Sequence, residues 1–153
     1  MPGVLRDVVE ADLAVFFEHQ REPEANRMAL FPARERDAFY AHWRRVLEND
    51  AVTKKTIVHE GNVAGNVLCW EHDRRRLVGY WLGRDFWGKG LATSALAELL
   101  DEVKIRPLHA WVATSNVASI RVLEKCGFVV TGSKTEFDEA YGERVEEVLL
   151  ELA

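Results

Sequence analysis

A glycine-rich segment in the middle of the chain has the residue types of a phosphate-binding loop. It reads Trp87-Gly88-Lys89-Gly90-Leu91-Ala92, follows an apolar stretch with strand character, and runs into a segment patterned as a helix. At such a junction, successive backbone N–H groups and the helix dipole favour a negatively charged group. Glycines at 88 and 90 also let a phosphate approach the backbone. The segment therefore predicts a site for a phosphate-bearing ligand.

Two familiar phosphate motifs do not fit this segment. Gly83 to Lys89 matches the start of a P-loop, but Gly90 stands where a nucleotide triphosphatase needs Ser or Thr to ligate magnesium. The dinucleotide-binding fingerprint needs Gly or Ala at the position of Thr93. A nucleotide-binding enzyme is therefore disfavoured.

A second motif lies about one strand further on, and the two motifs together resemble a known family. It reads Asn116-Val-Ala-Ser119-Ile-Arg-Val-Leu-Glu-Lys-Cys-Gly127-Phe128. The pair resembles the acetyl-CoA-binding core of the GNAT N-acetyltransferase superfamily, specifically its RimJ/RimL-like branch. The resemblance covers most of the chain and is most specific over residues 79–128. It departs at Trp87, where many relatives carry Arg or Gln, but only the backbone amides are expected to be needed there.

The resemblance implies acetyl-CoA as co-substrate, without a metal. The amides of the glycine loop would hold the pyrophosphate, the Asn-x-x-Ser helix would lie along the pantetheine arm, and the acetyl group would sit against the end of strand 76–82. Simpler interpretations are that Tyr80 and Trp81 only pack, that Lys89 points to solvent, and that Asn116 is a helix N-cap. The cofactor-binding residues that it implies are Tyr80, Trp81, Leu82, Trp87, Gly88, Lys89, Gly90, Leu91, Ala92, Thr93, Asn116 and Ser119.

The resemblance also implies two catalytic residues, Ser119 and Asp138. Ser119 would lie near the thioester sulfur as general acid. A hydrogen bond of about 1–3 kcal/mol would serve there, because a thiol of pKa about 8.5 is a tolerable leaving group. Asp138, counted back from Gly142, matches the position of the base in some relatives. The competing interpretation is an acidic hairpin facing water, whose other carboxylates are Glu136, Glu139 and Glu143.

The acceptor is expected to be a primary amine, either a protein N-terminus or a small molecule. Strand 76–82 contains no acid to act as a strong base. An α-amine has a pKa of about 7.7–8.0 and a lysine about 10.4, so the missing base favours the amine of lower pKa. The loop predicted over 22–33, with Asn26, Arg27 and Met28, is expected to form one wall of the acceptor site. A non-catalytic coenzyme A-binding regulatory or accessory module is the alternative from a different class.

Composition fits one globular domain over residues 1–153. The chain is 48% hydrophobic and 29% charged, and its net charge of −5 gives no sign of a nucleic-acid or membrane partner. No apolar run approaches the roughly 20 residues of a membrane span, and no signal peptide is recognised, so a cytoplasmic location is expected. The protein is expected to be a monomer or a homodimer. Cys69 and Cys126 are interpreted as buried small hydrophobes, and the histidines lack metal-ligand spacing.

The periodicity of apolar residues places these motifs on an alternation of strands and helices. It predicts an α/β (α+β) domain with a mixed sheet and helices on both faces. The resemblance implies that this is a GNAT-type fold whose central sheet is mostly antiparallel. The resemblance adds a splayed V between the two central strands, 76–82 and 108–112. Predicted strands cover 4–6, 56–59, 63–70, 76–82, 108–112, 129–133 and 145–152. Predicted helices start at about Asp12 and cover 35–48, 90–104 and 116–126, the last closed by Gly127 at its C′ position.

Overall fold

The computed structural model describes residues 4–153. Its strands are β1 (Leu5–Asp7), β2 (Thr53–His59), β3 (Asn62–His72), β4 (Arg75–Leu82), β5 (Leu108–Ala113), β6 (Val129–Asp138) and β7 (Glu143–Leu152). Its helices are α1 (Asp12–His19), α2 (Pro23–Ala29), α3 (Arg36–Glu48), α4 (Leu91–Glu102) and α5 (Val117–Lys125), with a 3-10 turn at Arg84–Phe86.

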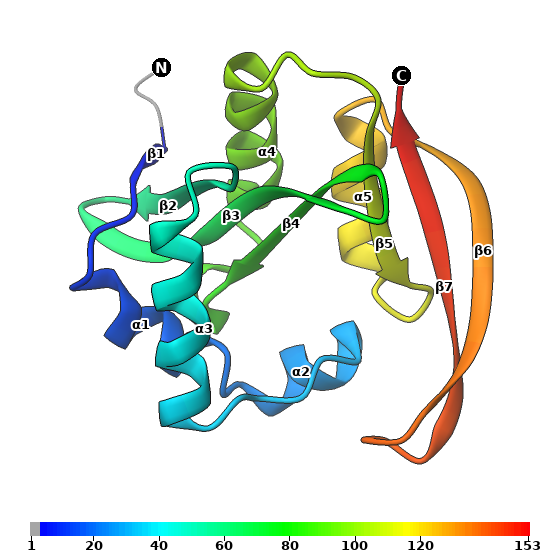
Figure 1. The fold of residues 1–153 in the computed structure, drawn as a ribbon, viewed down its shortest axis with the longest axis horizontal. Helices are drawn as coiled ribbons and strands as arrows, with labels where there is room; N and C mark the ends of the chain where they lie inside the picture. The colour runs from blue at the N-terminus through cyan, green and yellow to red at the C-terminus, as the bar shows by residue number, and fades with distance from the viewer. Residues whose placement is uncertain (1–3) are drawn as a thin grey trace.

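The strands form a single mixed sheet in the order β1-β2-β3-β4-β5-β7-β6 (Figure 1). Neighbouring strands are antiparallel except for β4 and β5, which are parallel. These two central strands share one paired position, Leu77 with His109, and separate toward their carboxyl ends. The structure therefore confirms the predicted V-shaped opening in the middle of a mostly antiparallel sheet.

Helices cover both faces of the sheet, as predicted (Figure 1). On one face, Leu96 and Leu99 of α4 are fully buried in the same core as Val67 of β3. On the other face α1 packs on α3, where the rings of Phe16 and Trp43 lie 5.0 Å apart. The alternation of side chains along each strand supplies both cores.

The segment predicted as a loop over 22–33 contains helix α2, so that prediction was wrong for residues 23–29. Glu22 caps the helix by accepting a hydrogen bond from a backbone N–H of its first turn, and Pro23 fixes the first helical position. Leu30 ends the helix in the left-handed conformation at φ 53°. The helix is short and has no apolar stripe of its own, so its sequence pattern resembles that of a loop.

The last two strands are longer than predicted. β6 and β7 are ten residues long each and pair with one another at nine positions, from Val129 with Glu151 to Asp138 with Glu143. β6 pairs only with β7 and is an edge strand, so Val129, Val130 and Phe137 remain more than half exposed. Of the two cysteines, Cys69 is fully buried and Cys126 is half-buried, and both are free thiols.

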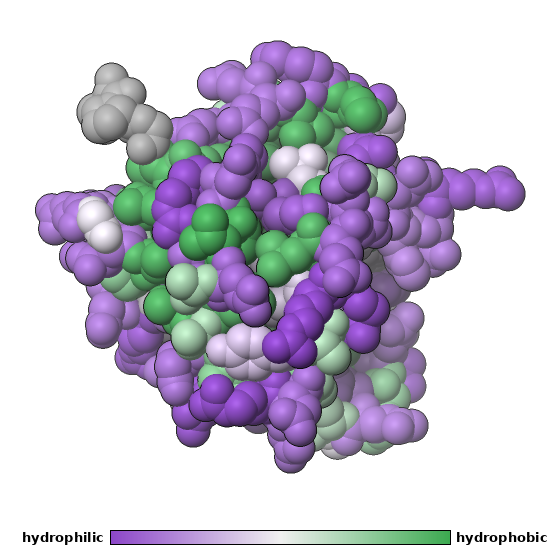
Figure 2. Space-filling model, turned by 60° about the vertical axis from the view of Figure 1, so that its left-hand side comes forward, coloured by the Kyte–Doolittle hydropathy of each residue, from purple (hydrophilic) through white to green (hydrophobic). Residues whose placement is uncertain are grey.

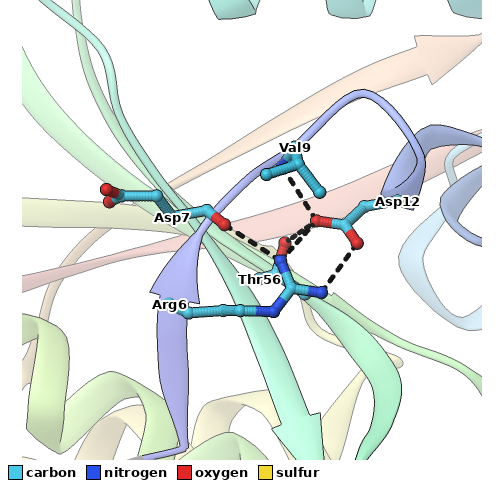
Figure 3. Close-up of polar contacts among 5 residues, drawn as sticks. All are labelled: Arg6, Asp7, Val9, Asp12 and Thr56. Carbon is cyan, nitrogen blue, oxygen red and sulfur yellow. Dashed lines mark hydrogen bonds and ion pairs between the residues drawn. The ribbon is translucent and has the colours of Figure 1, made fainter.

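A buried carboxylate ties the first strand to the first helix (Figure 3). Asp12 is only 3% exposed and accepts hydrogen bonds from both terminal nitrogens of Arg6 at 2.8 Å. It also accepts one from the backbone N–H of Val9 at 3.0 Å and one from the Thr56 hydroxyl at 2.7 Å. Burial by itself raises the pKa of Asp12, but the bonds from Arg6, Val9 and Thr56 outweigh it and hold the pKa below its usual value.

The surface seen from the side of β1 and β2 mixes polar and apolar residues. Figure 2 shows hydrophilic side chains around the rim of this view, with apolar side chains between them in its central part. Over residues 4–153, no helix has both the length and the apolar composition that crossing a membrane requires.

Candidate active site

Two adjoining cavities lie where β4 and β5 separate. The first, of about 340 Å³, is bounded by the end of β4, the glycine loop and the start of α5. It brings together every predicted cofactor-binding residue except Lys89. Its lining is Ala25, Met28, Ala29, Tyr80, Trp81, Leu82, Phe86, Trp87, Gly88, Gly90, Leu91, Ala92, Thr93, Asn116, Ala118, Ser119, Val122 and Lys125.

The glycine loop presents an open backbone to this cavity. Gly88 and Gly90 have φ of 76° and 74°, the left-handed region that side chains other than glycine rarely adopt. A Cβ at either position would meet no protein atom within 4 Å. Gly90 is the N-cap of α4 and no side chain caps that helix, so the N–H groups of its first turn are open to an external acceptor. These features make the loop suitable for an anionic group.

Trp87 fixes the loop to the end of β4. Its indole N–H donates to the carbonyl of Leu82 at 3.2 Å, and the Arg84 guanidinium lies 5.0 Å from the ring centroid. The side chain therefore holds the loop in place, which fits the expectation that only amides are needed at this position. Lys89 is exposed and does not line the cavity, whereas Lys125 of α5 does.

Strand alternation sends the side chains of Tyr80 and Trp81 to opposite faces of β4. The Tyr80 hydroxyl donates to the Ser119 carbonyl at 3.2 Å and lies 2.7 Å from the Ser119 hydroxyl oxygen. Burial raises the pKa of Tyr80 to about 12, so the phenol keeps its proton at neutral pH. Tyr80 thus fixes the position of Ser119 by hydrogen bonding. Trp81 donates from its indole N–H to the His19 carbonyl at 3.1 Å.

Asn116 caps helix α5, as predicted. Its side-chain oxygen accepts from the backbone N–H of Ser119, at a long 3.4 Å, and the helix closes with Gly127 at φ 97°. Asn116 lines both cavities, as Ser119 does. Capping uses only the oxygen, so the amide nitrogen of Asn116 is left to serve a ligand.

The second cavity, of about 370 Å³, opens between β4 and β5 on the side of α2. Five residues line it together with the first cavity: Ala29, Tyr80, Trp81, Asn116 and Ser119. The remaining lining residues are Leu30, Phe31, Val78, Gly79, Ala110, Trp111, Val112, Ala113, Leu123 and Glu147. A molecule in either cavity would therefore meet Ser119 at their junction.

The segment predicted to wall the acceptor site borders both cavities, and tertiary hydrogen bonds hold it there. The buried amide of Asn26 donates to the carbonyls of Gln20 and Phe31, both at 2.9 Å. The Ser115 hydroxyl donates to the Met28 carbonyl at 3.1 Å. Met28 lines the first cavity. Asn26 thus has a structural role that the sequence did not predict.

Arg27 points away from the cavities toward the β6–β7 hairpin. Its guanidinium lies 3.8 Å from the Glu143 carboxylate and 6.0 Å from the centroid of the Tyr141 ring. The predicted wall thus includes Met28 but not the Arg27 side chain.

The acidic residues that were predicted near the tip of the hairpin lie apart from the cavities. Asp138 is in the turn, where its carboxylate accepts from the backbone N–H of Tyr141 at 3.2 Å. Neither it nor Glu136, Glu139 or Glu143 lines either cavity. The assignment of Asp138 as base stays a prediction.

Sequence reasoning did not find Glu147, the carboxylate that the structure does place in the second cavity. Glu147 pairs with Ala113 across the β5–β7 ladder, which brings it to the open end of β5. The available signal was alternation along β7, which puts Glu147 on the same face as Leu149. Within residues 4–153, no group of three or more His, Cys, Asp or Glu side chains could hold a metal ion.

Comparison with known proteins identifies the class. The family model of the acetyltransferase (GNAT) domain matches residues 4–129, so the chain belongs to the GNAT acetyltransferase family. The uncharacterized N-acetyltransferase p20 of Bacillus licheniformis is 27% identical over 162 residues, which cover 97% of this chain and 90% of the relative.

Solved structures share the fold at low sequence identity. The ribosomal-protein-alanine N-acetyltransferase from Brucella melitensis has a TM-score of 0.84 at 19% identity, covering 97% of this chain and 98% of that one. The spermidine N-acetyltransferase from Vibrio cholerae, in complex with CoA and spermine, also has a TM-score of 0.84 at 19% identity, covering 97% and 93%. These matches confirm the predicted GNAT fold.

Proposed function

We propose that the protein transfers the acetyl group of acetyl-CoA to a primary amine. The observation that carries this proposal is the junction of the two cavities. The first joins the open glycine loop to the Asn116–Ser119 turn, and the second reaches the same serine from between β4 and β5. A ligand in each cavity would meet the other at the V between β4 and β5. We treat residues 1–153 as one domain, which the single sheet supports.

In this proposal the first cavity holds acetyl-CoA. The amides of residues 88–93 would bind the pyrophosphate, with Lys125 as the charged side chain of the lining. The Asn116 amide would bind the pantetheine arm. Backbone N–H groups of β4 that face the V have no partner strand beyond Leu77, so one of them is available to polarise the thioester carbonyl.

The reaction needs a neutral amine placed against the thioester carbon. The amine nitrogen forms a bond to that carbon, the carbon–sulfur bond breaks, and the proton lost by the amine balances the one gained by the thiolate. When the Tyr80 proton turns from the Ser119 carbonyl to the Ser119 hydroxyl oxygen, the Ser119 proton is free to bond to the departing sulfur. Ser119 is the proposed acid, and Asp138 is kept as the candidate base to be tested.

The acceptor is either a protein N-terminus or a small amine. We propose the RimJ/RimL-like branch, which the similarity to the Brucella ribosomal-protein-alanine enzyme supports. The equally similar spermidine enzyme keeps small amines in the panel of acceptors to be tested.

Calorimetric titration with acetyl-CoA tests the proposal directly. Gly90→Val should weaken binding at least about tenfold, because the new side chain enters the open space of the loop. Gly61→Val is the matched control: Gly61 also has positive φ, at 81°, and open space around its Cβ, but it lies in the β2–β3 turn. Equal affinity of the two variants would remove the loop from the site.

Turnover is then measured by free-thiol detection with N-terminal peptides and small amines. Thiol release that depends on the amine supports transfer. Tight binding of acetyl-CoA with no release from any amine would instead indicate a coenzyme A-binding module.

A further inference from the structure

The charged residues that line the two cavities have opposite signs. Lys125 is the charged side chain of the first cavity, and Glu147 is that of the second. The first cavity would therefore attract an anion, which suits a phosphate-bearing ligand. The second would attract a cation, and its lining contains no Lys, Arg or His.

The Glu147 carboxylate has spare capacity to accept hydrogen bonds. Its side chain is 29% exposed, and the nearest cation, the Lys134 ammonium, lies 3.9 Å away, beyond hydrogen-bond distance. No side-chain or backbone donor within residues 4–153 is hydrogen-bonded to this carboxylate. A bound ammonium group could donate to Glu147 without displacing an existing hydrogen bond.

Aromatic rings form the walls around this carboxylate. Phe31, Trp81 and Trp111 line the cavity, and the Phe31 and Trp81 ring centroids lie 5.9 Å apart. Trp111 already interacts with a cation, because the Lys134 nitrogen lies 4.4 Å from its ring centroid. Aromatic faces favour ammonium groups and apolar substituents, and they provide no partner for a carboxylate.

The cations closest to the cavity each lie beside an acid of the β6–β7 hairpin, at 3.8–3.9 Å. Lys134 lies between Glu147, Glu136 and the Trp111 ring, and Arg27 is paired with Glu143. A ligand carboxylate beside the reacting amine would face Glu147 in a half-buried, largely apolar cavity whose lining supplies no cation. Two carboxylates in contact within one cavity repel strongly when water is partly excluded from it.

We propose, resting on the acetyl-transfer function above, that the second cavity selects primary amines that carry an apolar substituent and no carboxylate on the carbon next to the nitrogen. Glu147 binds the incoming ammonium, Phe31, Trp81 and Trp111 bind the substituent, and Glu147 repels free α-amino acids. Glu147 is a specificity residue in this proposal, acting on the acceptor before it is deprotonated.

Phenethylamine and phenylalanine form the matched pair of probes. They share the aromatic group and the amine, and they differ by the carboxylate. Phenylalanine has the lower amine pKa, so a preference based on neutral amine alone would favour phenylalanine. The structure predicts the opposite order.

Binding is measured first without acetyl-CoA, by tryptophan fluorescence, since Trp81 and Trp111 line the cavity. Phenethylamine should bind at least about tenfold more tightly than phenylalanine, the effect of about 1.4 kcal/mol of repulsion. Glu147→Gln should bring the two affinities to within about threefold of each other. Glu146→Gln is the control, with the same change of charge at the exposed neighbour on the other face of β7, and it should leave the preference unchanged.

The same order is expected in kcat/KM for the two amines. Equal binding of the two probes, or a preference that Glu147→Gln leaves unchanged, overturns the inference even if acetyl transfer is observed. Failure of acetyl-CoA to bind or to release thiol overturns the proposed function. The fluorescence titration would still test the selectivity of the second cavity in that case.

Discussion

Two polar clusters in this protein differ in how completely their hydrogen bonds are made. Around Asp12, four donors from β1, the turn after it and β2 converge on one carboxylate (Figure 3). At the junction of the cavities, Tyr80 and Ser119 bond to each other, and the Asn116 nitrogen is left over. Both clusters join segments that are distant in sequence. Only the second borders empty space.

The difference separates a group that stabilises the fold from groups available to a ligand. A buried carboxylate with every partner in place is held rigidly, and removing it leaves its donors unpaired. A hydroxyl pair beside a cavity keeps one proton or lone pair free. Substitution in the first cluster should change stability without changing ligand binding, and substitution in the second should change binding or catalysis more than stability.

The largest expected effect is on stability, from Asp12→Ala. It should lower the free energy of unfolding by about 3 kcal/mol, because Thr56 and the Val9 N–H lose their buried acceptor. Chemical denaturation measures this change, and acetyl-CoA affinity should stay the same. Asp7→Ala is the control, since Asp7 is an exposed acid paired with Lys55, and it should cost much less. Similar losses for both variants would contradict the special role of Asp12.

The same carboxylate predicts how stability depends on pH. The pKa of Asp12 is lower in the folded than in the unfolded chain, so its contribution is complete above the unfolded value of about 3.9. Stability should fall as the pH drops from there through the folded pKa, because the unfolded state then binds the proton more readily. Asp12→Asn should remove this part of the dependence in denaturation curves measured between about pH 5 and pH 2. An unchanged slope would show that other acids dominate.

The next effect is on catalysis, from Ser119→Ala. It should lower kcat about tenfold and raise the KM for acetyl-CoA less, because a bond to the departing sulfur strengthens as charge develops. Steady-state kinetics measures both parameters. Tyr80→Phe should act through the same bond, so the double variant should lose less than the sum of the single losses. Additive losses would show that the two hydroxyls act independently.

A smaller effect is expected from Asn116→Ala, and it divides between stability and binding. Loss of the cap should destabilise the fold by about 0.5–1 kcal/mol, at the low end because the bond is long at 3.4 Å. The KM for acetyl-CoA should also rise. Asn116→Ser keeps a capping oxygen but has no amide, so it should retain thermal stability and still raise the KM. If the KM changes in neither variant, Asn116 is only a cap.

The smallest effect is expected from Asp138→Asn. As a base, Asp138 must be deprotonated, so the substitution should remove the acidic limb of the pH–rate profile and leave acetyl-CoA affinity intact. An α-amine acceptor would make the change modest, since part of that amine is neutral without a base. Glu143→Gln, at the paired position across the hairpin, is the control. An unaltered profile on the best substrate would remove the assignment.

The residues that line the first cavity could be predicted to lie together because most of them are local in sequence. Glycines at 88 and 90 need only their own turn to expose the amides, and Asn116 caps the helix that carries Ser119. The local conformation of a single loop or helix end can be predicted without knowing which distant segments pack against it. The strands were predicted from their apolar pattern and the central V of the sheet from the family resemblance, and the structure confirms the V.

The acceptor side depends on register and tertiary contacts, which single-sequence patterns do not contain. Glu147 reaches the cavity because β7 pairs with β5 in one register, and a shift by one residue would turn it to the other face. Helix α2 is held by Asn26 and by Ser115, which lies far along the chain. Its seven residues are too few to form a stable helix alone.

The V between β4 and β5 gives the sheet two additional edges in its interior. Backbone amides beyond Leu77 in β4 that face β5 have no strand partner, although β4 is the central strand of the seven. In a continuous sheet such amides would be among the slowest to exchange with deuterium. Here they should exchange as quickly as those of an outer strand, and bound acetyl-CoA should slow them by filling the opening. The centre of this sheet would then be its most ligand-sensitive part.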